Sequence, residues 1–177
     1  MMRNEAALKT AASKPTGWIL RDLVRGVAAG LAGTAAMSLS QSAEIAATGR
    51  KPSATPAEAA CVLLGIETRT EAQEQRFARE AHWAYGTLWG LGQIPLRRMP
   101  EPYRSLMYFA AAWGAGAVLL TRLKLAPPPT DWKTSSLLSD LGHHAVYTGA
   151  SNLVFDLLDR SLPTSSAADR LRSGSEA

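Results

Sequence analysis

Four apolar segments rich in small residues divide this chain of 177 residues, and they constrain its fold more than any other feature. The link between the second and third segments is short, so the helices on either side of it should be antiparallel neighbours. We predict an all-α fold, an up-and-down bundle of four helices with a short amphipathic helix between the first two. The segments are Gly26–Ala43, Ala81–Leu96, Ser105–Thr121 and Leu141–Phe155.

The composition favours a membrane location for this bundle. Charged residues make up 19% of the chain, below the usual quarter for soluble domains, and 46% of the residues are hydrophobic. The uncharged stretches are about 15 to 18 residues long, at the lower limit for crossing a bilayer of about 30 Å. The mean hydropathy of −0.06 is low for a membrane protein, partly because alanine, glycine and serine are frequent. We predict four transmembrane helices, and a soluble four-helix bundle is the alternative.

Capping signals and prolines set the expected helix ends. Thr55 and Glu58 are spaced as a capping box before the short helix, and Gly65 is placed to end it. The proline run 127–129 terminates the third long helix. The expected helices are Trp18–Ala47, Pro56–Leu64, Glu71–Pro95, Pro102–Leu125 and Thr134–Arg160.

The expected domain organisation is a single membrane domain, residues 17–162, between a flexible leader, 1–16, and a flexible tail, 163–177. A cleaved signal peptide is disfavoured, because the first apolar stretch begins only at Gly26 and three similar stretches follow it. Eleven Lys and Arg residues lie on the side of the two termini and eight on the other side. This bias predicts a multi-pass protein of a bacterial plasma membrane with both termini in the cytoplasm.

Several classes of function lack support in the sequence. The net charge of +4 is spread out, and no Lys/Arg run alternates with aromatic residues, which argues against a nucleic-acid partner. The single cysteine, Cys61, excludes an intramolecular disulfide and a multi-cysteine metal site. No phosphate-binding loop, nucleophile elbow, zinc-protease motif or dinucleotide fingerprint is present, so we do not predict an enzyme.

Small residues recur at helical spacing within the apolar segments. This small-xxx-small pattern lets two helices approach closely in lipid. We expect it to pack the helices of the bundle and to support a homo-oligomer or a contact with another membrane protein, in addition to contact with the lipid bilayer. The glycines assigned to helix packing are Gly26, Gly30, Gly33, Gly86, Gly90, Gly142 and Gly149.

The hint of chemistry is a group of ionisable residues that up-and-down topology would place at one end of the bundle: Glu44, His82, Asp140, His143 and His144. Histidine and carboxylate together can bind a divalent metal such as zinc, and they can relay protons in a membrane. Two histidines on facing helices could instead hold a haem. The competing interpretation is structural, because helix-end histidines and acids often form interhelical hydrogen bonds or caps. We assign no cofactor, with a divalent metal as the alternative.

The other end holds polar residues for which we predict interhelical hydrogen bonds. Asn152 and Asp156 are one turn apart on the fourth long helix, and Gln93 lies near the end of the second. Tyr85, Tyr108 and Tyr147 are expected to act in the same way.

These patterns favour a structural or interaction protein of the membrane. The alternative is a proton or divalent-cation transporter, or a channel-like protein, that uses the cluster of Glu44, the three histidines and Asp140. A metal-dependent membrane hydrolase would use the same residues, but no nucleophile or general base stands out.

The sequence also resembles a known family. The segments GVAAGLAGTAAM, HWAYGTLWG and DLGHHAVYTGAS are similar to parts of the YagU-like family of small bacterial four-helix inner-membrane proteins. The resemblance covers about Asp22 to Arg160. It implies an integral membrane protein with four helices, and it supplies no substrate and no site residues.

Overall fold

The computed structural model describes residues 16–50, 55–67 and 70–161, and these ranges contain helices and no strand. The predicted all-α fold is therefore confirmed for this part of the chain. The predicted flexible leader covers residues 1–16 and the predicted flexible tail residues 163–177. Both lie outside the described residues, except Thr16, which is the first residue of a helix. The helices are α2 (Thr16–Thr48), α3 (Thr55–Leu64), α4 (Glu71–Gly90), α5 (Gln93–Leu96), α6 (Tyr103–Arg122), a 3-10 turn η1 (Pro129–Asp131) and α7 (Thr134–Ser161).

Most helix ends fall close to their predicted positions. The side chain of Thr70 caps α4 by accepting a hydrogen bond from the backbone N–H of Gln73. Gly65 ends α3 with φ of +63°, a left-handed conformation that glycine adopts without a steric penalty. The helix expected over Glu71–Pro95 is instead divided, because the chain turns at residues 91–92 between α4 and α5.

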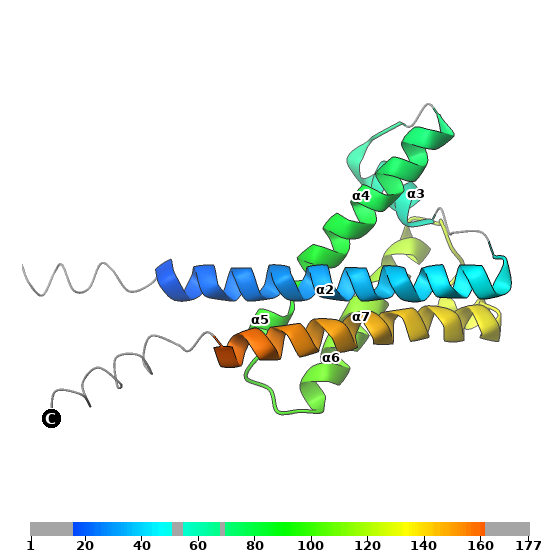
Figure 1. The fold of residues 1–177 in the computed structure, drawn as a ribbon. Helices are drawn as coiled ribbons and strands as arrows, with labels where there is room; N and C mark the ends of the chain where they lie inside the picture. The colour runs from blue at the N-terminus through cyan, green and yellow to red at the C-terminus, as the bar shows by residue number, and fades with distance from the viewer. Residues whose placement is uncertain (1–15, 51–54, 68–69, 162–177) are drawn as a thin grey trace, which may run out of the picture.

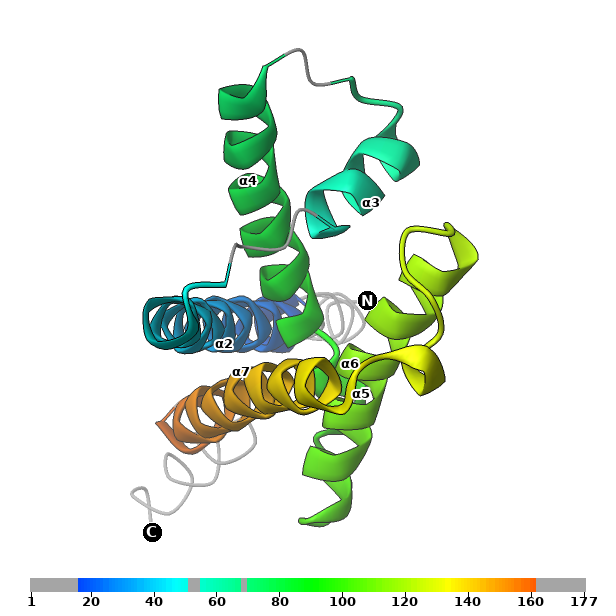
Figure 2. The ribbon, with the colours of Figure 1, turned by 90° about the vertical axis from the view of Figure 1, so that its right-hand side faces the viewer.

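The two longest helices, α2 and α7, lie side by side and antiparallel, as Figure 1 shows. Helix α4 packs on α2 and α6 packs on α7, but both cross the α2–α7 pair steeply instead of running alongside it (Figure 2). Helix α3 packs on α4, and the short α5 contacts α2 and α6. Up-and-down pairing is thus seen for α2 and α7, while α4 and α6 lie across them.

Glycines make the crossing of α2 and α4 possible. A Cβ added to Gly30 would collide with the backbone of Thr87, and one added to Gly90 would collide with the backbone of Gly26. A Cβ on Gly86 would likewise collide with the hydroxyl of Thr34. Gly26, Gly30, Gly86 and Gly90 therefore lie where α2 and α4 approach each other closely, and the small-xxx-small packing role assigned to them stays a prediction.

The remaining packing glycines fall into two groups. A Cβ on Gly33 would lie 2.7 Å from the ring of Tyr147, so this glycine serves the contact between α2 and α7. By contrast, a Cβ on Gly142 or Gly149 would meet no atom within 4 Å. The prediction that these two glycines pack helices within the chain needs correction, because they lie on the face of α7 turned away from the described helices.

Hydrogen bonds made by polar side chains join four helices, α4, α5, α6 and α7. The hydroxyl of Tyr147 donates to the carbonyl oxygen of Gly86 (2.6 Å) and lies 3.1 Å from the hydroxyl of Tyr108. Tyr108 also lies 3.1 Å from the hydroxyl of Ser151, which accepts a bond of 3.0 Å from the Gln93 amide. The predicted interhelical hydrogen bonding of Tyr108, Tyr147 and Gln93 is confirmed. Tyr85, for which the same role was predicted, is 45% exposed, and its ring contacts that of Trp89 on its own helix.

Eight of the buried residues are polar or charged and eight are hydrophobic, and many large apolar side chains are exposed. Among the described residues, the largest fully buried side chains include Arg25, Gln93, Thr34 and Ser151, while Phe155 is the one purely hydrocarbon side chain of that set. Large apolar side chains, in contrast, stand exposed on α2, α3, α4, α6 and α7. Within the described ranges one helix, over Trp18–Thr48, is long and apolar enough to cross a membrane by length and composition.

Candidate functional site

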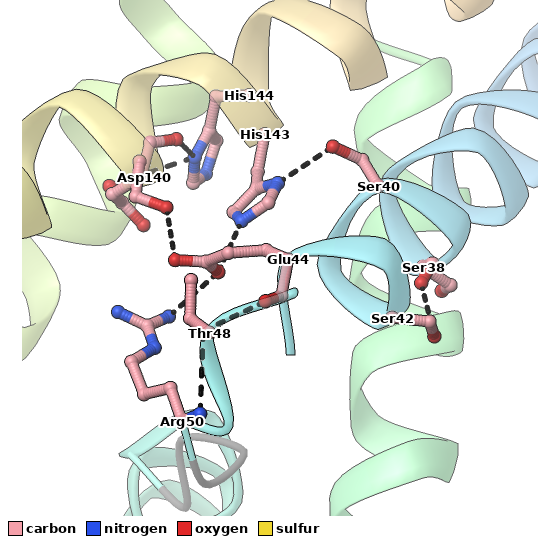
Figure 3. Close-up of polar contacts among 10 residues, drawn as sticks. Ser38, Ser40, Ser42, Glu44, Thr48, Arg50, Asp140, His143 and His144 are labelled. Atoms are coloured by element: carbon pink, nitrogen blue, oxygen red, sulfur yellow. Dashed lines mark hydrogen bonds and ion pairs between the residues drawn. The ribbon is translucent and has the colours of Figure 1, made fainter. Parts of the chain in front are cut away.

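A chain of hydrogen bonds links the end of α2 to the beginning of α7 (Figure 3). The Ser40 hydroxyl lies 2.9 Å from Nδ1 of His143, and Nε2 of the same imidazole lies 2.9 Å from a carboxylate oxygen of Glu44. His143 is buried, with 8% of its side chain exposed. The imidazole therefore bridges a hydroxyl and a carboxylate that stand one turn apart on α2.

The Glu44 carboxylate has two further partners. Ser139 donates a hydrogen bond of 2.6 Å to one oxygen, and the guanidinium of Arg50 lies 3.2 Å from the other. Ser139 and His143 are one turn apart on α7, so both reach the same carboxylate. The sequence analysis did not identify Ser40, Ser139 or Arg50, although the one-turn spacing of each serine from Glu44 or His143 was a usable signal.

His144 and Asp140 form a second, separate group. Nδ1 of His144 lies 2.9 Å from the backbone carbonyl of Asp140 and 3.7 Å from its carboxylate. The same carboxylate accepts a hydrogen bond of 2.8 Å from the indole of Trp113 on α6. Successive residues of a helix point about 100° apart, so His144 faces away from the site of His143.

His82, on α4, completes the predicted cluster but belongs to neither group. Its Nε2 lies 3.4 Å from the hydroxyl of Ser38 on α2. The five predicted residues are therefore distributed over three local hydrogen-bond groups. Within residues 16–50, 55–67 and 70–161, no set of three or more His, Cys, Asp and Glu side chains is arranged to hold a metal ion.

The order hydroxyl, imidazole, carboxylate in Ser40, His143 and Glu44 is one that can pass a proton. Acyl transfer would in addition require free donors to stabilise an oxyanion. Ser40 lies inside α2, where backbone N–H groups are engaged in the helix itself. The geometry is thus suited to proton transfer or to structural bonding more than to nucleophilic catalysis.

The opposite end of the α2–α7 pair buries a network of charges that the sequence analysis did not identify. The guanidinium of Arg25 lies 3.0 Å from the Asp22 carboxylate and 2.9 Å from that of Asp159 on α7. Arg97, which directly follows α5, contacts the other oxygen of Asp22 at 2.5 Å. Asp22 and Arg25 are 3% and 2% exposed. A charged pair at i, i+3 within an apolar helix was the signal for this network.

A third polar group fixes α6 against α7. Arg104 donates to Asp156 at 2.7 Å, and Asn152 donates to the hydroxyl of Ser105 at 2.8 Å, so the predicted bonding of both α7 residues is confirmed. Hydrogen bonds from Ser105 and Arg104 to Glu101, in the link before α6, lower the pKa of that carboxyl below its usual value.

Comparisons with known proteins add no information about these sites. No family model, curated protein or solved structure matches the chain. The resemblance to the YagU-like family accordingly stays a prediction.

Proposed function

We propose that this chain is a multi-pass integral protein of a bacterial plasma membrane with a structural or interaction role. The observation that carries the proposal is the distribution of side chains: large apolar ones are exposed on five helices, while half of the buried ones are polar or charged. A soluble domain rarely exposes large contiguous apolar patches and rarely buries charged side chains in such a proportion. In hydrocarbon the preference reverses, because apolar surface is well solvated by lipid and polar groups must find partners inside the protein.

The lengths of the helices are compatible with this location. Helices α2 and α7 have 33 and 28 residues, which correspond to about 50 and 42 Å at about 1.5 Å per residue. Both exceed a hydrocarbon core of about 30 Å even when tilted. We assign them as the main spans, with the apolar parts of α4 and α6 as shorter tilted elements. Since the beginning of α2 and the end of α7 lie at one end (Figure 1), both termini would face the cytoplasm.

Self-association is the interaction that the outer face of α7 supports best. Gly142 and Gly149 are exposed there and would allow a second helix to approach closely. Leu138, Val146 and Leu153 share this face at helical spacing and are 63%, 40% and 60% exposed. A second copy of the chain would bury this surface against its own equivalent.

Extraction and native electrophoresis test the two parts of the proposal in order. The protein should remain in membranes washed at alkaline pH and enter solution only with detergent. In mild detergent it should migrate as an oligomer, and Gly149→Leu should convert it to a monomer. The matched control is Gly114→Leu on α6, a position where a Cβ also meets no atom within 4 Å. A monomer in the wild type would contradict self-association, and a water-soluble protein would contradict the membrane location.

Proton transfer is the alternative function, and the hydrogen-bonded chain of Ser40, His143 and Glu44 favours it. Proton flux into proteoliposomes, followed with an internal pH dye, should then be abolished in His143→Gln and preserved in His144→Gln. Equal flux in empty liposomes and proteoliposomes would rule this alternative out. Divalent-cation transport receives less support, since the predicted ligands divide among three groups.

A further inference from the structure

The hairpin formed by α3 and the first half of α4 stands away from the α2–α7 pair (Figure 2). Helix α3 packs mainly on α4, and α4 reaches α2 through its second half, where Gly86 and Gly90 lie against Thr34 and Gly26. The surface of this hairpin therefore lies outside the packing of the long helices, and its composition indicates what surrounds it.

The end of α3 exposes a cluster of large apolar side chains at the closed end of the hairpin. Val62, Leu63 and Leu64 are 57%, 56% and 66% exposed, and Ile66, just after the helix, is 40% exposed. Large apolar side chains that adjoin one another in this way are uncommon on surfaces that face water, and they mark a contact with a partner or a membrane. Water alone is therefore an unfavourable environment for the end of α3.

The first half of α4, which packs beside α3, has the opposite character. Five of the ten residues in Glu71–Glu80 are charged, and four of these five are exposed. Arg76 and Glu80, with side chains 76% and 63% exposed, form an ion pair of 3.1 Å at the surface. Charged side chains are costly inside hydrocarbon unless they face a partner in the protein interior. The hydrocarbon core is therefore an equally unfavourable environment for this half of α4.

Beyond the charged half, the exposed side chains of α4 change in the order in which a bilayer changes from its surface inward. Trp83 and Tyr85 come next and are 40% and 45% exposed, and indole and phenol side chains favour the level of the headgroups. Leu88, about one turn further, is 63% exposed beside Thr87, which lies at the crossing with α2. Aromatic residues between charges and leucine indicate a boundary between lipid and water near the middle of α4.

The direction of the hairpin agrees with this order. Figure 1 shows the first turn of α4 near the level of the end of α2, where the long helix would leave the bilayer. The end of α3 lies further toward the middle of α2 than this first turn does (Figure 1). The apolar end of α3 is thus on the lipid side of the charged half of α4, at the side of the membrane opposite to the termini.

We propose that the α3–α4 hairpin is an interfacial element that binds the surface of the phospholipid bilayer. The end of α3 inserts among the outer parts of the acyl chains, and the first half of α4 lies among headgroups and water, as amphipathic helices do at membrane surfaces. The inference rests on the proposed membrane location and adds a lipid contact that the spanning helices do not make. A protein partner over α3 would account for its apolar end but not for the order of side chains along α4.

The test uses the full-length protein with single spin-labelled cysteines, reconstituted in liposomes of phosphatidylcholine and phosphatidylglycerol. Leu64→Cys, Arg76→Cys and Leu88→Cys, in a Cys61→Ala background, replace side chains that are 66%, 76% and 63% exposed, so the labels differ in place more than in exposure. Molecular oxygen concentrates in lipid, whereas a nickel chelate stays in water. The ratio of oxygen to nickel collision rates should be highest for Leu88→Cys, intermediate for Leu64→Cys and lowest for Arg76→Cys. Val62→Cys, 57% exposed, repeats the measurement on the same surface if Leu64→Cys does not reconstitute.

Three results would overturn the proposal. A ratio for Leu64→Cys as low as that for Arg76→Cys would place the end of α3 in water, and a ratio as high as that for Leu88→Cys would place it in the hydrocarbon core. Low collision rates with both reagents would mean that protein, such as a second copy of the chain, covers α3. In each of these cases a high ratio for Leu88→Cys would leave the membrane location standing, whereas a low ratio at all three labels would contradict the membrane location as well.

Discussion

The two polar ends of the α2–α7 pair stabilise their buried polar groups in different ways. At the end near the termini, Asp22, Arg25, Arg97 and Asp159 bury full charges in ion pairs, and cavities open beside them. At the histidine end, Glu44 and His143 bond directly to each other, Ser40 and Ser139 each bond one of them, and the exposed Arg50 pairs with Glu44. The first end therefore relies on direct ion pairs between charged side chains, whereas the second also uses the hydroxyls of Ser40 and Ser139.

This difference shows that the residue types that stand out in a sequence need not be the ones that line a cavity. The histidines attract attention in the sequence, yet their hydrogen-bonding atoms are largely directed at protein partners. The arginines look like ordinary flanking charges, yet they line the two cavities beside the ion pairs.

The largest expected effect comes from breaking the charged end. Arg25→Met should lower the free energy of unfolding by about 3 kcal/mol, because it leaves the buried carboxylate of Asp22 with one partner in place of two. Unfolding in mixed micelles with increasing denaturing detergent measures this. Arg76→Met, which removes an exposed pair with Glu80, should cost less than about 1 kcal/mol. An equal loss of unfolding free energy in both variants would mean that the buried ion pairs stabilise the protein no more than the exposed one.

The histidine end should be more tolerant than the charged end. His143→Leu should destabilise the protein by about 2 kcal/mol, since the Ser40 hydroxyl and one Glu44 oxygen each lose a partner. His144→Leu should cost less, because His144 is more exposed and its shortest bond is to a backbone carbonyl of its own helix. The same detergent titration compares the two variants, and a larger loss for His144→Leu would contradict the assignment of His143 as the central bridge.

Local signals explain why the helices were predictable while the sites were not. Thr70, Gly65 and the proline run 127–129 act through neighbouring residues, so the sequence contains all the information that their helix ends require. The role of Gly30 against that of Gly149 depends on which helix lies opposite, and the two have the same local surroundings of small residues. The glycines that lie at helix contacts depend on the directions of α4 and α6. The spacing of small residues in the sequence does not determine these directions.

The same limit applies to the predicted cluster. Glu44, Asp140, His143 and His144 lie near one another (Figure 3), whereas His82 contacts Ser38 on α2. Side-chain direction then separates them, because His143 faces α2 while its neighbour His144 turns back to Asp140. Arg97 and Asp22 are 75 positions apart, and nothing in either local sequence indicates the other.

A smaller effect on stability is expected from Glu101, a surface carboxylate outside the buried network of Asp22. The pKa of Glu101 is lowered in the folded state by hydrogen bonds from Ser105 and Arg104, so its contribution to stability is complete above its ordinary pKa of 4.5 and is lost as pH falls through the folded value. The melting temperature of the wild type should therefore fall more steeply below pH 4.5 than that of Glu101→Gln. Glu58→Gln gives the baseline for the loss of one exposed carboxylate, and identical acid profiles for Glu101→Gln and the wild type would contradict this contribution.

The smallest expected effect is the response of the histidine end to metal. Free zinc at 100 times the dissociation constant of a site would raise the free energy of unfolding by about 2.7 kcal/mol. Because the predicted ligands lie in three groups, we expect micromolar zinc to leave the melting temperature of the wild type unchanged. Stoichiometric zinc that raises this temperature in the wild type but not in His82→Ala/His144→Ala would restore the metal hypothesis and reverse the comparison of the two ends.

The central claim, that apolar side chains on the outside face lipid, is tested most directly by the reactivity of introduced cysteines. Leu88→Cys and Val118→Cys occupy positions that are 63% and 60% exposed, and Arg76→Cys replaces a side chain that is 76% exposed, all in a Cys61→Ala background. In open membrane fragments, a water-soluble maleimide should label Arg76→Cys rapidly and the other two very slowly. Labelling of all three at similar rates would place the apolar surface in water and contradict the account.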